Sequence, residues 1–581
     1  MDSKSPLHEV VVIGSGFGGA ISCCRMAQKW GKDVLLLERG KRYPMGSFPR
    51  TPHDMASNFW SVPDDGVKRP QHIQKQSLRG MFDVRNYPKM DALVCAGLGG
   101  GSLIYANVFL EPPDEVFKRG WPAVLNKTTL QPYYTVAKSV LNARPIPPWQ
   151  NDPRRKIVRT ELFQEFAQDQ GRTSKLADLC VFFGNNHQQP TDIGIQEKNR
   201  YGATQTSCTY CAECDAGCNT HSKNTVDLNY LYVAEHVHGA QIKTDCLAEK
   251  IVPLNANGEE DTVANGEHGY RVYYRDLDEG AKTVDTRRVI LSAGTLGTNE
   301  LLLRCRDTFG SLPRLSPQLG KRFSGNGDFL SFVIEGKKPA DPNYGPVITQ
   351  YTDYNLFEKH DAQRAFVLED ASYPAFLAWV IEGLQPSLNP LGMVKKFWRG
   401  VQSLWRKLVQ TLVDGKWSGS LGDFFNQILK DDASYNSSVL LCMGLDNGDG
   451  ELKLRDGNLD LHWPQSSMPL YHAILACGEK FKAFVQSCFF MPLPTWLWPV
   501  RNNITVHPLG GCALADSPEQ GVTSANDKNR GEVFGYHGLY VADGSVLPSA
   551  VGANPIATIS AVSEWIAEGI TGIKPSDDLG M

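Results

Sequence analysis

The chain has 581 residues, more than one hydrophobic core usually supports, so its length predicts two or more folding units. Apolar residues make up 41% of the chain and charged residues 21%, a globular composition that excludes the disordered, fibrous and membrane-spanning classes. The formal net charge of −4 gives no electrostatic reason to expect a nucleic acid as a partner.

The N-terminus shows no features of an export signal. Residues 1–14 (MDSKSPLHEVVVIG) run directly into a strand pattern, without a basic region, an apolar region and a cleavage site. The most apolar run, residues 488–500, is short and broken by prolines, so it is not expected to span a bilayer. We therefore predict a cytoplasmic protein, in which clustered cysteines indicate metal binding rather than a disulfide framework.

The first structured segment has the pattern of a dinucleotide-binding unit. An apolar run at 9–14 predicts a buried parallel strand, GSGFGG follows at 14–19 before a helical segment, and the next apolar run ends at Glu38. The three glycines are expected, in order, to form the tight turn, to admit the pyrophosphate and to let the helix pack on the strand. They are Gly14, Gly16 and Gly19.

The acidic residue at position 38 is expected to bond the ribose hydroxyls, while the helix N-terminus donates amides to the phosphate. An acid here argues against a 2′-phosphate and leaves FAD or NAD as the cofactor. The alternative interpretation is a βα turn with only a structural role.

Two further segments, taken with the first, resemble the glucose-methanol-choline (GMC) family of FAD oxidoreductases. Residues 95–113 (CAGLGGGSLIYANVFLEPP) are similar to the second glycine-rich loop of that family, which approaches the flavin and its diphosphate. Residues 289–304 resemble the strand, turn and helix that return to the FAD domain, with Gly294 at the turn. The resemblance implies that the cofactor is FAD. The matching residues of the second loop are Gly97, Gly100, Gly101 and Ser102.

The strongest match lies at the C-terminal end, in residues 507–516 (HPLGGCALAD) and 538–570, and it is closest to the cholesterol oxidases. By this resemblance His507 and Asn554 face the flavin from the substrate side. Two more residues are expected to lie against the FAD: Asp543 and Gly544.

The chemistry agrees with that assignment, because hydride removal from a carbinol carbon requires a group that receives the hydroxyl proton. The imidazole of His507 suits this role, and the amide of Asn554 can orient the hydroxyl. Glu369 aligns with the glutamate that moves a proton when cholesterol oxidases isomerise the steroid double bond. Asp370 follows it directly, so the sequence leaves open which carboxylate points inward, and a solvated acidic pair is the alternative.

The implied activity is FAD-dependent oxidation of a secondary alcohol on a hydrophobic, sterol-like substrate, with isomerisation as an additional step. The loop after Ser102 lacks the asparagine-glycine pair expected in the secreted cholesterol oxidases, so Tyr105, Ala106 and Asn107 are expected to reshape the wall near the flavin. Two alternatives therefore stay open. One is a dehydrogenase of a sugar or other non-steroid alcohol, and the other is a non-enzymatic flavin electron-transfer or binding protein.

The segment CTYCAECDAGC places Cys208, Cys211, Cys214 and Cys218 in the Cx2Cx2Cx3C spacing of bacterial ferredoxins, although Asn219 rather than a proline follows. We prefer an iron-sulfur cluster as the interpretation, with structural zinc or a metal-free loop as alternatives. Some flavin sugar dehydrogenases of the GMC family carry such a cluster in a comparable place. The resemblance thus implies a relay of electrons from FAD to an acceptor protein or a quinone.

The expected fold is α/β, a Rossmann-like FAD-binding domain with an inserted α+β substrate domain built from a mixed or antiparallel sheet and helices. Both ends of the chain belong to the FAD domain, so the two domains are discontinuous. We assign residues 7–112, 221–330 and 500–571 to the FAD-binding domain, and residues 113–220 and 331–499 to the substrate domain.

Residues 393–413 predict an amphipathic helix, with seven apolar residues on one face, five basic residues mostly on the other and no acidic ones. This pattern suits peripheral contact with a membrane, where water-insoluble alcohols reside. A helix packed on the core with a solvated basic face is the alternative. The polar residues 255–269 predict a surface hairpin loop.

Overall fold

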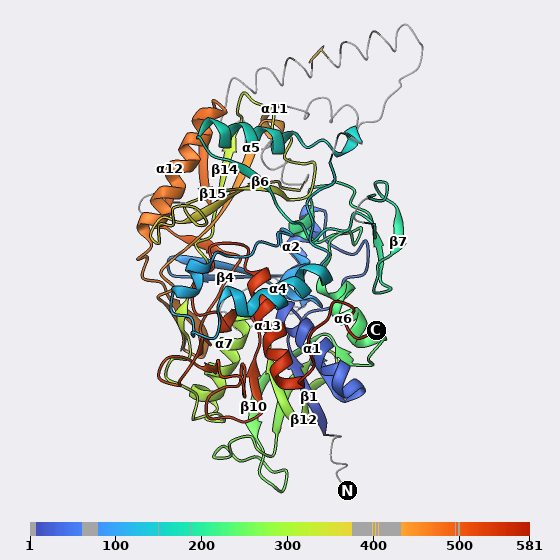
Figure 1. Cartoon of the computed structure of the whole chain (residues 1–581), viewed down its shortest axis with the longest axis vertical. Coiled ribbons are helices and arrows are strands. Elements are labelled where there is room, and N and C mark those ends of the chain that lie inside the picture. The colour runs from blue at the N-terminus through green and yellow to red at the C-terminus, as the bar shows by residue number, and fades with distance from the viewer. Residues whose placement is uncertain are drawn as a thin grey trace.

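The structure is a computed structural model that describes residues 7–60, 79–148, 152–186, 189–374, 432–493 and 500–581, together with isolated positions between these ranges. Two large sheets dominate it, a seven-stranded sheet in the lower half of Figure 1 and a six-stranded sheet in the upper half. The α/β fold expected from the sequence is confirmed.

The seven-stranded sheet contains the predicted nucleotide-binding unit. Its strand order is β10-β11-β12-β1-β2-β9, with β26 paired to β12. The pairings from β12 through β1 and β2 to β9 are parallel, as is that of β26. The strands are β1 (His8–Ile13), β2 (Val34–Leu37), β9 (Gln241–Lys243), β10 (Cys246–Pro253), β11 (Tyr270–Asp276), β12 (Gly280–Leu291) and β26 (Leu539–Val541).

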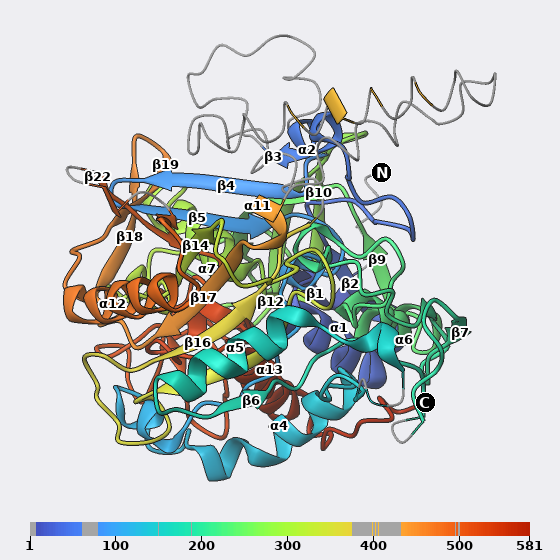
Figure 2. The same ribbon diagram turned by 90° about the horizontal axis from the view of Figure 1, so that it is seen from above.

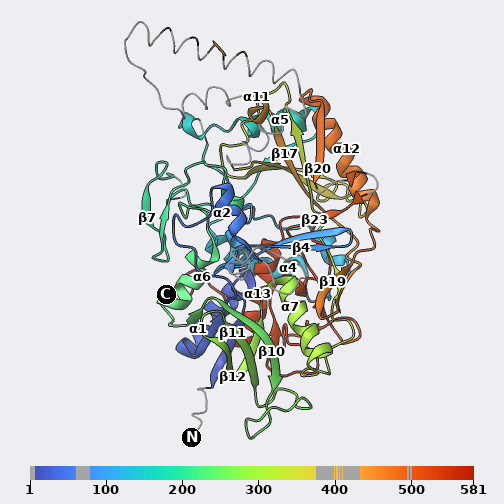
Figure 3. The ribbon, with the colours of Figure 1, turned by 180° about the vertical axis from the view of Figure 1, so that it is seen from behind.

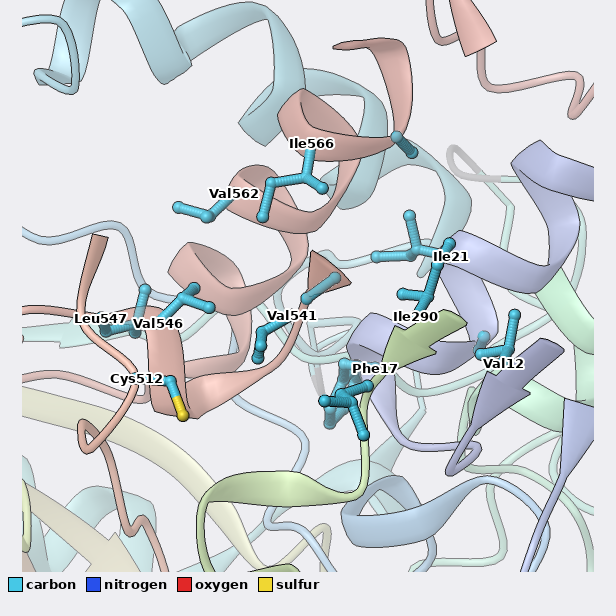
Figure 4. Close-up of a cluster of buried hydrophobic side chains, with 14 of the residues drawn as sticks. Val12, Phe17, Ile21, Ile290, Cys512, Val541, Val546, Leu547, Val562 and Ile566 are labelled. Carbon is cyan, nitrogen blue, oxygen red and sulfur yellow. The ribbon is translucent and has the colours of Figure 1, made fainter. Parts of the chain in front are cut away.

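Helices α1 (Phe17–Trp30) and α13 (Ile556–Thr571) pack together beside this sheet, and their contacts form part of the core around the predicted nucleotide-binding unit. Figure 4 shows Val12 and Ile290 from the strands close to Ile21 of α1, with Val562 of α13 nearby. These side chains are fully buried, and each such burial stabilises the fold by roughly 1.5–3 kcal/mol. The continuous apolar runs of the sequence are therefore strands buried on both faces, as parallel strands are.

Two local predictions outside the first unit are also confirmed. Residues 255–269 connect the antiparallel strands β10 and β11, as expected of a hairpin loop. Residues 289–304 form the end of β12, a turn and helix α7 (Gly294–Leu303).

The six-stranded sheet is antiparallel throughout, in the order β20-β14-β17-β16-β15-β6. One face is covered by α5 (Val158–Asp169) and α12 (Met468–Phe484), through buried side chains such as Phe163, Phe166 and Ile474. The opposite face is therefore turned away from these helices. The strands are β6 (Ser174–Leu176), β14 (Phe329–Ile334), β15 (Ile348–Tyr354), β16 (Phe366–Ala371), β17 (Ser438–Gly444) and β20 (Phe489–Leu493).

A smaller four-stranded sheet lies between the two large ones, as the rear view in Figure 3 shows, and β4 runs across the top of the view in Figure 2. In it β23 (Asn503–Thr505) pairs in parallel with β5 (Met90–Cys95). Parallel strands end at the same edge, so this pairing brings the second glycine-rich loop, after β5, close to His507, after β23. The other strands are β3 (Phe59–Trp60) and β4 (Phe82–Tyr87).

Most of the predicted amphipathic segment 393–413 lies outside the described residues, so membrane contact stays a prediction. Its described positions include Trp398, Val401, Trp405 and Val409, all exposed. Among the described helices none is long and apolar enough to cross a membrane. The exact domain division and the cytoplasmic location also stay predictions.

Candidate active site and cofactor cradle

The three glycines of the first loop have different surroundings. A Cβ atom at Gly14, whose φ is +95°, would lie 2.3 Å from the Ser292 carbonyl oxygen, and one at Gly19 would lie 2.0 Å from the Gly14 carbonyl oxygen. Neither position accepts a side chain. A Cβ at Gly16 would meet nothing within 4 Å. The first and third glycines therefore serve the packing, while Gly16 leaves the open space that a pyrophosphate needs.

Ser15 connects the first loop with Glu38 and with the second loop. Its backbone N–H and its hydroxyl lie 3.1 and 2.6 Å from Glu38 Oε2, and its Oγ accepts a hydrogen bond from Gly99 N at 3.0 Å. Gly40 N donates to Glu38 Oε1 at 2.8 Å. Burial raises the pKa of Glu38, against these hydrogen bonds, which lower it. The Glu38 carboxylate therefore holds the first loop against the end of β2. A hydrogen bond from Glu38 to a ribose stays a prediction.

The second glycine-rich loop lies directly against the first. A Cβ at Gly100, whose φ is +52°, would lie 2.6 Å from Gly16 Cα, whereas one at Gly101 would meet nothing within 4 Å. The buried Ser102 accepts a hydrogen bond from Val226 N at 3.1 Å and so holds the loop in place. The open sides of Gly16 and Gly101 fit an elongated diphosphate between backbone amides.

Two more predicted FAD contacts have protein partners of their own. A Cβ at Gly97 would lie 2.6 Å from Leu103 Cδ1, so this glycine lets its own loop fold back. The buried Asp543 accepts hydrogen bonds from Thr298 Oγ1 at 2.6 Å and from Ser545 N at 2.9 Å. Asp543 therefore ties the end of β26 to α7.

The start of α7 and the residue after Asp543 leave different amounts of room. A Cβ at Gly294, which begins α7 with a φ of +74°, would meet nothing within 4 Å, and one at Gly544 would lie 3.2 Å from Thr295 Oγ1. The FAD contacts of Gly97, Gly294, Asp543 and Gly544 stay predictions.

His507 follows β23 and is held by a carboxylate that the sequence did not single out. Its Nδ1 lies 2.8 Å from Asp328 Oδ1, and its side chain is 15% exposed. The other carboxylate oxygen, Oδ2, accepts hydrogen bonds from Val506 N at 2.8 Å and His507 N at 3.1 Å. Within the described part of the chain, His507 Nε2 has no hydrogen-bond partner. This arrangement leaves Nε2 free to meet a substrate.

Asn554 lies next to Glu369, and its Nδ2 donates to Glu369 Oε2 at 3.5 Å. Burial raises the pKa of Glu369 well above its ordinary range, against the Asn554 hydrogen bond and helped by the negative charges of Asp370 and Asp328. Glu369 Oε1 and Asn554 Oδ1 are buried, and neither has a hydrogen-bond partner among the residues that the structure describes. The site therefore holds a carboxyl group that favours its protonated form, beside an amide with free hydrogen-bonding capacity.

The structure distinguishes the two adjacent carboxylates. Successive residues of a strand point to opposite faces, and Asp370 points toward α5, where Arg159 Nε lies 3.4 Å from its Oδ2. Its other oxygen accepts hydrogen bonds from Thr349 N and Gln350 N at 2.8 and 2.6 Å. Glu369 is left on the face toward Asn554. Both carboxylates are buried, so the alternative of a solvated acidic pair does not describe them.

Apolar side chains flank Glu369 across the sheet. Strand pairing puts Tyr351 of β15 on one side of it and Leu441 of β17 on the other, and Leu330 of β14 pairs with Leu441. Residues directly opposite each other in antiparallel strands share a face. All three side chains are half-buried, unlike the fully buried Glu369. The face toward Asn554 therefore presents an apolar surface around one carboxyl group.

A single turn before β14 holds both candidate catalytic segments. Asp328 binds the His507 segment, and Asn326 Oδ1 accepts hydrogen bonds from Val551 N and Gly552 N at 3.0 Å each. Asn326 Nδ2 also donates to the Ala553 carbonyl at 2.9 Å, directly before Asn554. Sequence reasoning missed this turn. The available signal was its run of polar residues, SGNGD at 324–328, immediately before an apolar strand.

The four clustered cysteines, Cys208, Cys211, Cys214 and Cys218, line one cavity. Across the described ranges, no group of three or more histidine, cysteine or acidic side chains is placed to hold a metal ion. Burial raises the pKa of Cys208 and Cys214, and that of Cys211 to about 12, which favours the thiol forms. The four cysteines therefore share a cavity, but within the described residues they are not arranged as a metal ligand set.

Lys223 joins this cavity to the second glycine-rich loop. The buried ammonium donates hydrogen bonds to the carbonyl oxygens of Leu103 at 2.7 Å, Tyr105 at 3.1 Å and Cys214 at 2.6 Å. Burial lowers the pKa of Lys223 to about 8. The Tyr105 ring in turn contacts Phe17 of the first loop at a centroid distance of 5.4 Å. The cysteine segment therefore lies against the predicted flavin side of the molecule.

Two family models match the sequence of this chain over segments that contribute to the site. The two GMC oxidoreductase family models match residues 16–324 and residues 499–563. The chain belongs to the GMC oxidoreductase family. It is an FAD-dependent oxidoreductase that acts on CH–OH donors, and the open space beside Gly16 and Gly101 fits that cofactor.

Relatives of this GMC oxidoreductase act on different alcohols, judging by their names. It is 27% identical to a cholesterol oxidase of Acinetobacter baumannii over 582 residues, covering 96% of the chain and 93% of the relative. A cholesterol oxidase of Mycobacterium tuberculosis is 26% identical over 609 residues, with 98% and 93% covered. A long-chain-alcohol oxidase of Arabidopsis thaliana is 22% identical, with 97% and 67% covered.

Solved structures show the same fold at lower identity. Pyridoxine 4-oxidase from Mesorbium loti has a TM-score of 0.56 at 13% identity, with 97% of this chain and 98% of that one covered. A fungal aryl-alcohol oxidase has a TM-score of 0.57 at 14% identity, with 97% and 99% covered. The comparisons thus establish an alcohol oxidoreductase and leave its substrate open.

Proposed function

We propose that this enzyme oxidises a secondary alcohol on a hydrophobic, sterol-like substrate to the ketone. The observation that carries the proposal is the half-buried apolar surface of Leu330, Tyr351 and Leu441 around the buried Glu369. A sugar offers hydroxyls on every side and would leave them unpaired against such a surface. The two cholesterol oxidase relatives support the same substrate class.

In the proposed reaction, His507 and Asn554 have different roles. FAD, when bound, accepts the hydride from the carbinol carbon. His507 accepts the hydroxyl proton at Nε2, the ring nitrogen without a protein partner. Asn554 keeps an unpartnered Oδ1 that can fix the position of the hydroxyl.

Glu369 suits a later proton transfer. Burial raises its pKa, so the carboxylate formed on ionisation is a stronger base. It can take a proton from the ring carbon beside the ketone and return it to another ring carbon, and a double bond moves without net consumption of protons. Isomerisation of a sterol double bond is therefore part of the proposed function. We assign this proton transfer to Glu369, which contacts Asn554, and not to Asp370, which pairs with Arg159.

Anaerobic reduction of the bound flavin tests the substrate class. The purified protein is mixed with a 3β-hydroxysteroid, a long-chain primary alcohol or a sugar, and loss of the flavin absorbance is followed. The steroid is expected to bleach the flavin fastest. Faster bleaching by the sugar would contradict the proposal and favour the dehydrogenase alternative, and faster bleaching by the primary alcohol would replace the sterol with an aliphatic substrate.

A second proposal, favoured by the shared cavity of the four cysteines, is that their thiolates would hold an iron-sulfur cluster, which would supply an electron carrier for the flavin. Lys223 links this cavity to the second glycine-rich loop through hydrogen bonds of 2.6 to 3.1 Å, and this link supports the proposal because that loop is expected to approach the flavin. The thiols would have to rearrange and ionise to become ligands. The electrons would then pass to an acceptor protein or a quinone.

A further inference from the structure

The two oxygens of Asp328 have different partners. Oδ1 lies 2.8 Å from Nδ1 of His507 and has no second hydrogen-bond partner in the described ranges, whereas Oδ2 accepts hydrogen bonds from the backbone N–H groups of Val506 and His507 at 2.8 and 3.1 Å. The Thr505 hydroxyl also lies 3.2 Å from Oδ2. A carboxylate can only accept, so the hydrogen in the contact with His507 must be on Nδ1.

We propose that Asp328 is a positioning residue that fixes the tautomer and the orientation of His507. With its hydrogen on Nδ1, the neutral ring presents a lone pair at Nε2, which is the atom that must receive the substrate proton. The carboxylate also stabilises the ring once it carries both protons. This inference rests on the proposed function of His507, and it adds a residue 179 positions away in the chain.

The place of Asp328 does not depend on its own side chain. Asp446 holds the same turn, because its carboxylate accepts hydrogen bonds from Ser324 Oγ at 2.7 Å and from Gly327 N at 3.0 Å. Residue 328 also directly precedes β14 (Phe329–Ile334), which is paired on both sides. A change of the Asp328 side chain is therefore expected to leave the turn in place.

Asp328→Asn makes a sharp test, because the structure dictates how the new amide must lie. Its oxygen has to take the place of Oδ2, since an NH2 group there would face two backbone donors. The NH2 group then faces His507 and donates to Nδ1. This forces the ring hydrogen onto Nε2, which can no longer accept a proton.

The measurement is single-turnover flavin reduction by the alcohol, in the FAD-bound protein. Asp328→Asn should lower the rate at saturating alcohol by about a hundredfold or more, the scale of losing a positioned base. The alcohol concentration at half-maximal rate should change little, because Nε2–H still bonds the hydroxyl, now as a donor. Nitrogen-15 NMR of histidine-labelled protein, assigned by comparison with His507→Ala, should show the ring hydrogen moving from Nδ1 to Nε2.

A double-mutant cycle separates positioning from a loosened structure. If Asp328 acts only through His507, then Asp328→Asn should slow the wild type and have no further effect in a His507→Ala background. An equal loss in both backgrounds, or an unchanged tautomer, would overturn the inference. If Asp328→Asn does not retain FAD, Asp328→Ser goes through the same cycle and is judged in the same way.

The same variants distinguish the positioning role of Asp328 from the proposed proton-accepting role of His507. If His507→Ala alone leaves flavin reduction at the wild-type rate, the role of His507 is wrong and the positioning role is overturned with it. If His507→Ala is slow and Asp328→Asn is as fast as the wild type, only the positioning role is overturned.

Discussion

Asn554 Nδ2 lies 3.5 Å from Glu369 Oε2, and this contact joins the segment before α13 to the six-stranded sheet. Asn554 lies within the C-terminal motif, and Glu369 lies on an inner strand among apolar side chains. Burial raises the pKa of Glu369 and favours its neutral form; the Asn554 hydrogen bond opposes this shift, and the charges of Asp370 and Asp328 add to it. The proposed oxidation and isomerisation would therefore use separate proton carriers, His507 and Glu369.

Glu369→Gln should separate the two reactions. The amide keeps the size of the side chain and an oxygen for Asn554, but it has no proton that it can transfer. A 3β-hydroxy-5-ene steroid should still bleach the flavin at close to the wild-type rate, while its product keeps the double bond unconjugated. Ultraviolet absorbance of the conjugated enone provides the measurement. Formation of the enone at the wild-type rate would assign isomerisation to another group.

The same substitution should change how stability depends on pH. Burial raises the folded-state pKa of Glu369, so above the ordinary carboxyl pKa the unfolded chain ionises while the folded one stays protonated. Stability from this group is present at low pH and is lost as pH rises toward the raised pKa, by at most about 1.4 kcal/mol per pH unit. Glu369→Gln should therefore gain stability relative to the wild type as pH rises. Denaturant unfolding of both proteins at several pH values measures this difference, and a constant difference would contradict it.

The nucleotide-binding unit could be predicted from the sequence because its signals are local. The apolar run that became β1, the glycines and the run ending at Glu38 lie within 30 residues of one another. The contacts around His507 could not be predicted in this way, because Asp328 lies 179 residues away and belongs to no spaced motif. Long-range strand pairing decides such contacts.

The choice between Glu369 and Asp370 shows a second limit. Both follow an apolar run, and alternation along a strand shows only that they point to opposite faces. The position of α5 decides the question, because its Arg159 pairs with Asp370 and marks that face as the helix-covered one. The sequence shows that the side chains of the strand alternate between two faces, but only the packing of α5 shows which face the helix covers.

Gly16 should be required for the cofactor and not for the fold. A Cβ atom at this position would meet nothing within 4 Å in the protein, so Gly16→Leu is expected to fold and yet to block the pyrophosphate. The variant is expected to purify colourless, with a thermal unfolding midpoint close to that of the wild type stripped of FAD. Gly14→Ala is the matched control: its φ of +95° and a contact of 2.3 Å with Ser292 should destabilise the FAD-free protein itself. Retention of FAD by Gly16→Leu would place the cofactor elsewhere.

The cysteine cavity should bind a redox-active cluster when the protein is prepared anaerobically. Its ferredoxin-like spacing and its link through Lys223 to the second glycine-rich loop both support this expectation. Iron and sulfide analysis, with electron paramagnetic resonance of the reduced protein, gives the direct test, because zinc gives no such signal. Stoichiometric zinc, or no metal at all, would refute the relay.

If iron is present, Cys214→Ser should separate electron exit from hydride transfer. Turnover with an artificial acceptor should fall, because electrons would leave the flavin through the proposed cluster. Single-turnover flavin reduction should stay close to the wild-type rate, because the proposed hydride transfer uses His507 and Asn554 instead. Cys246→Ser, in β10 and outside the cavity, is the matched control and should change neither rate. An equal loss of both rates in Cys214→Ser would mean that the cysteine segment only supports the loop held by Lys223. That outcome would leave the proposed alcohol oxidation intact and remove the relay from it.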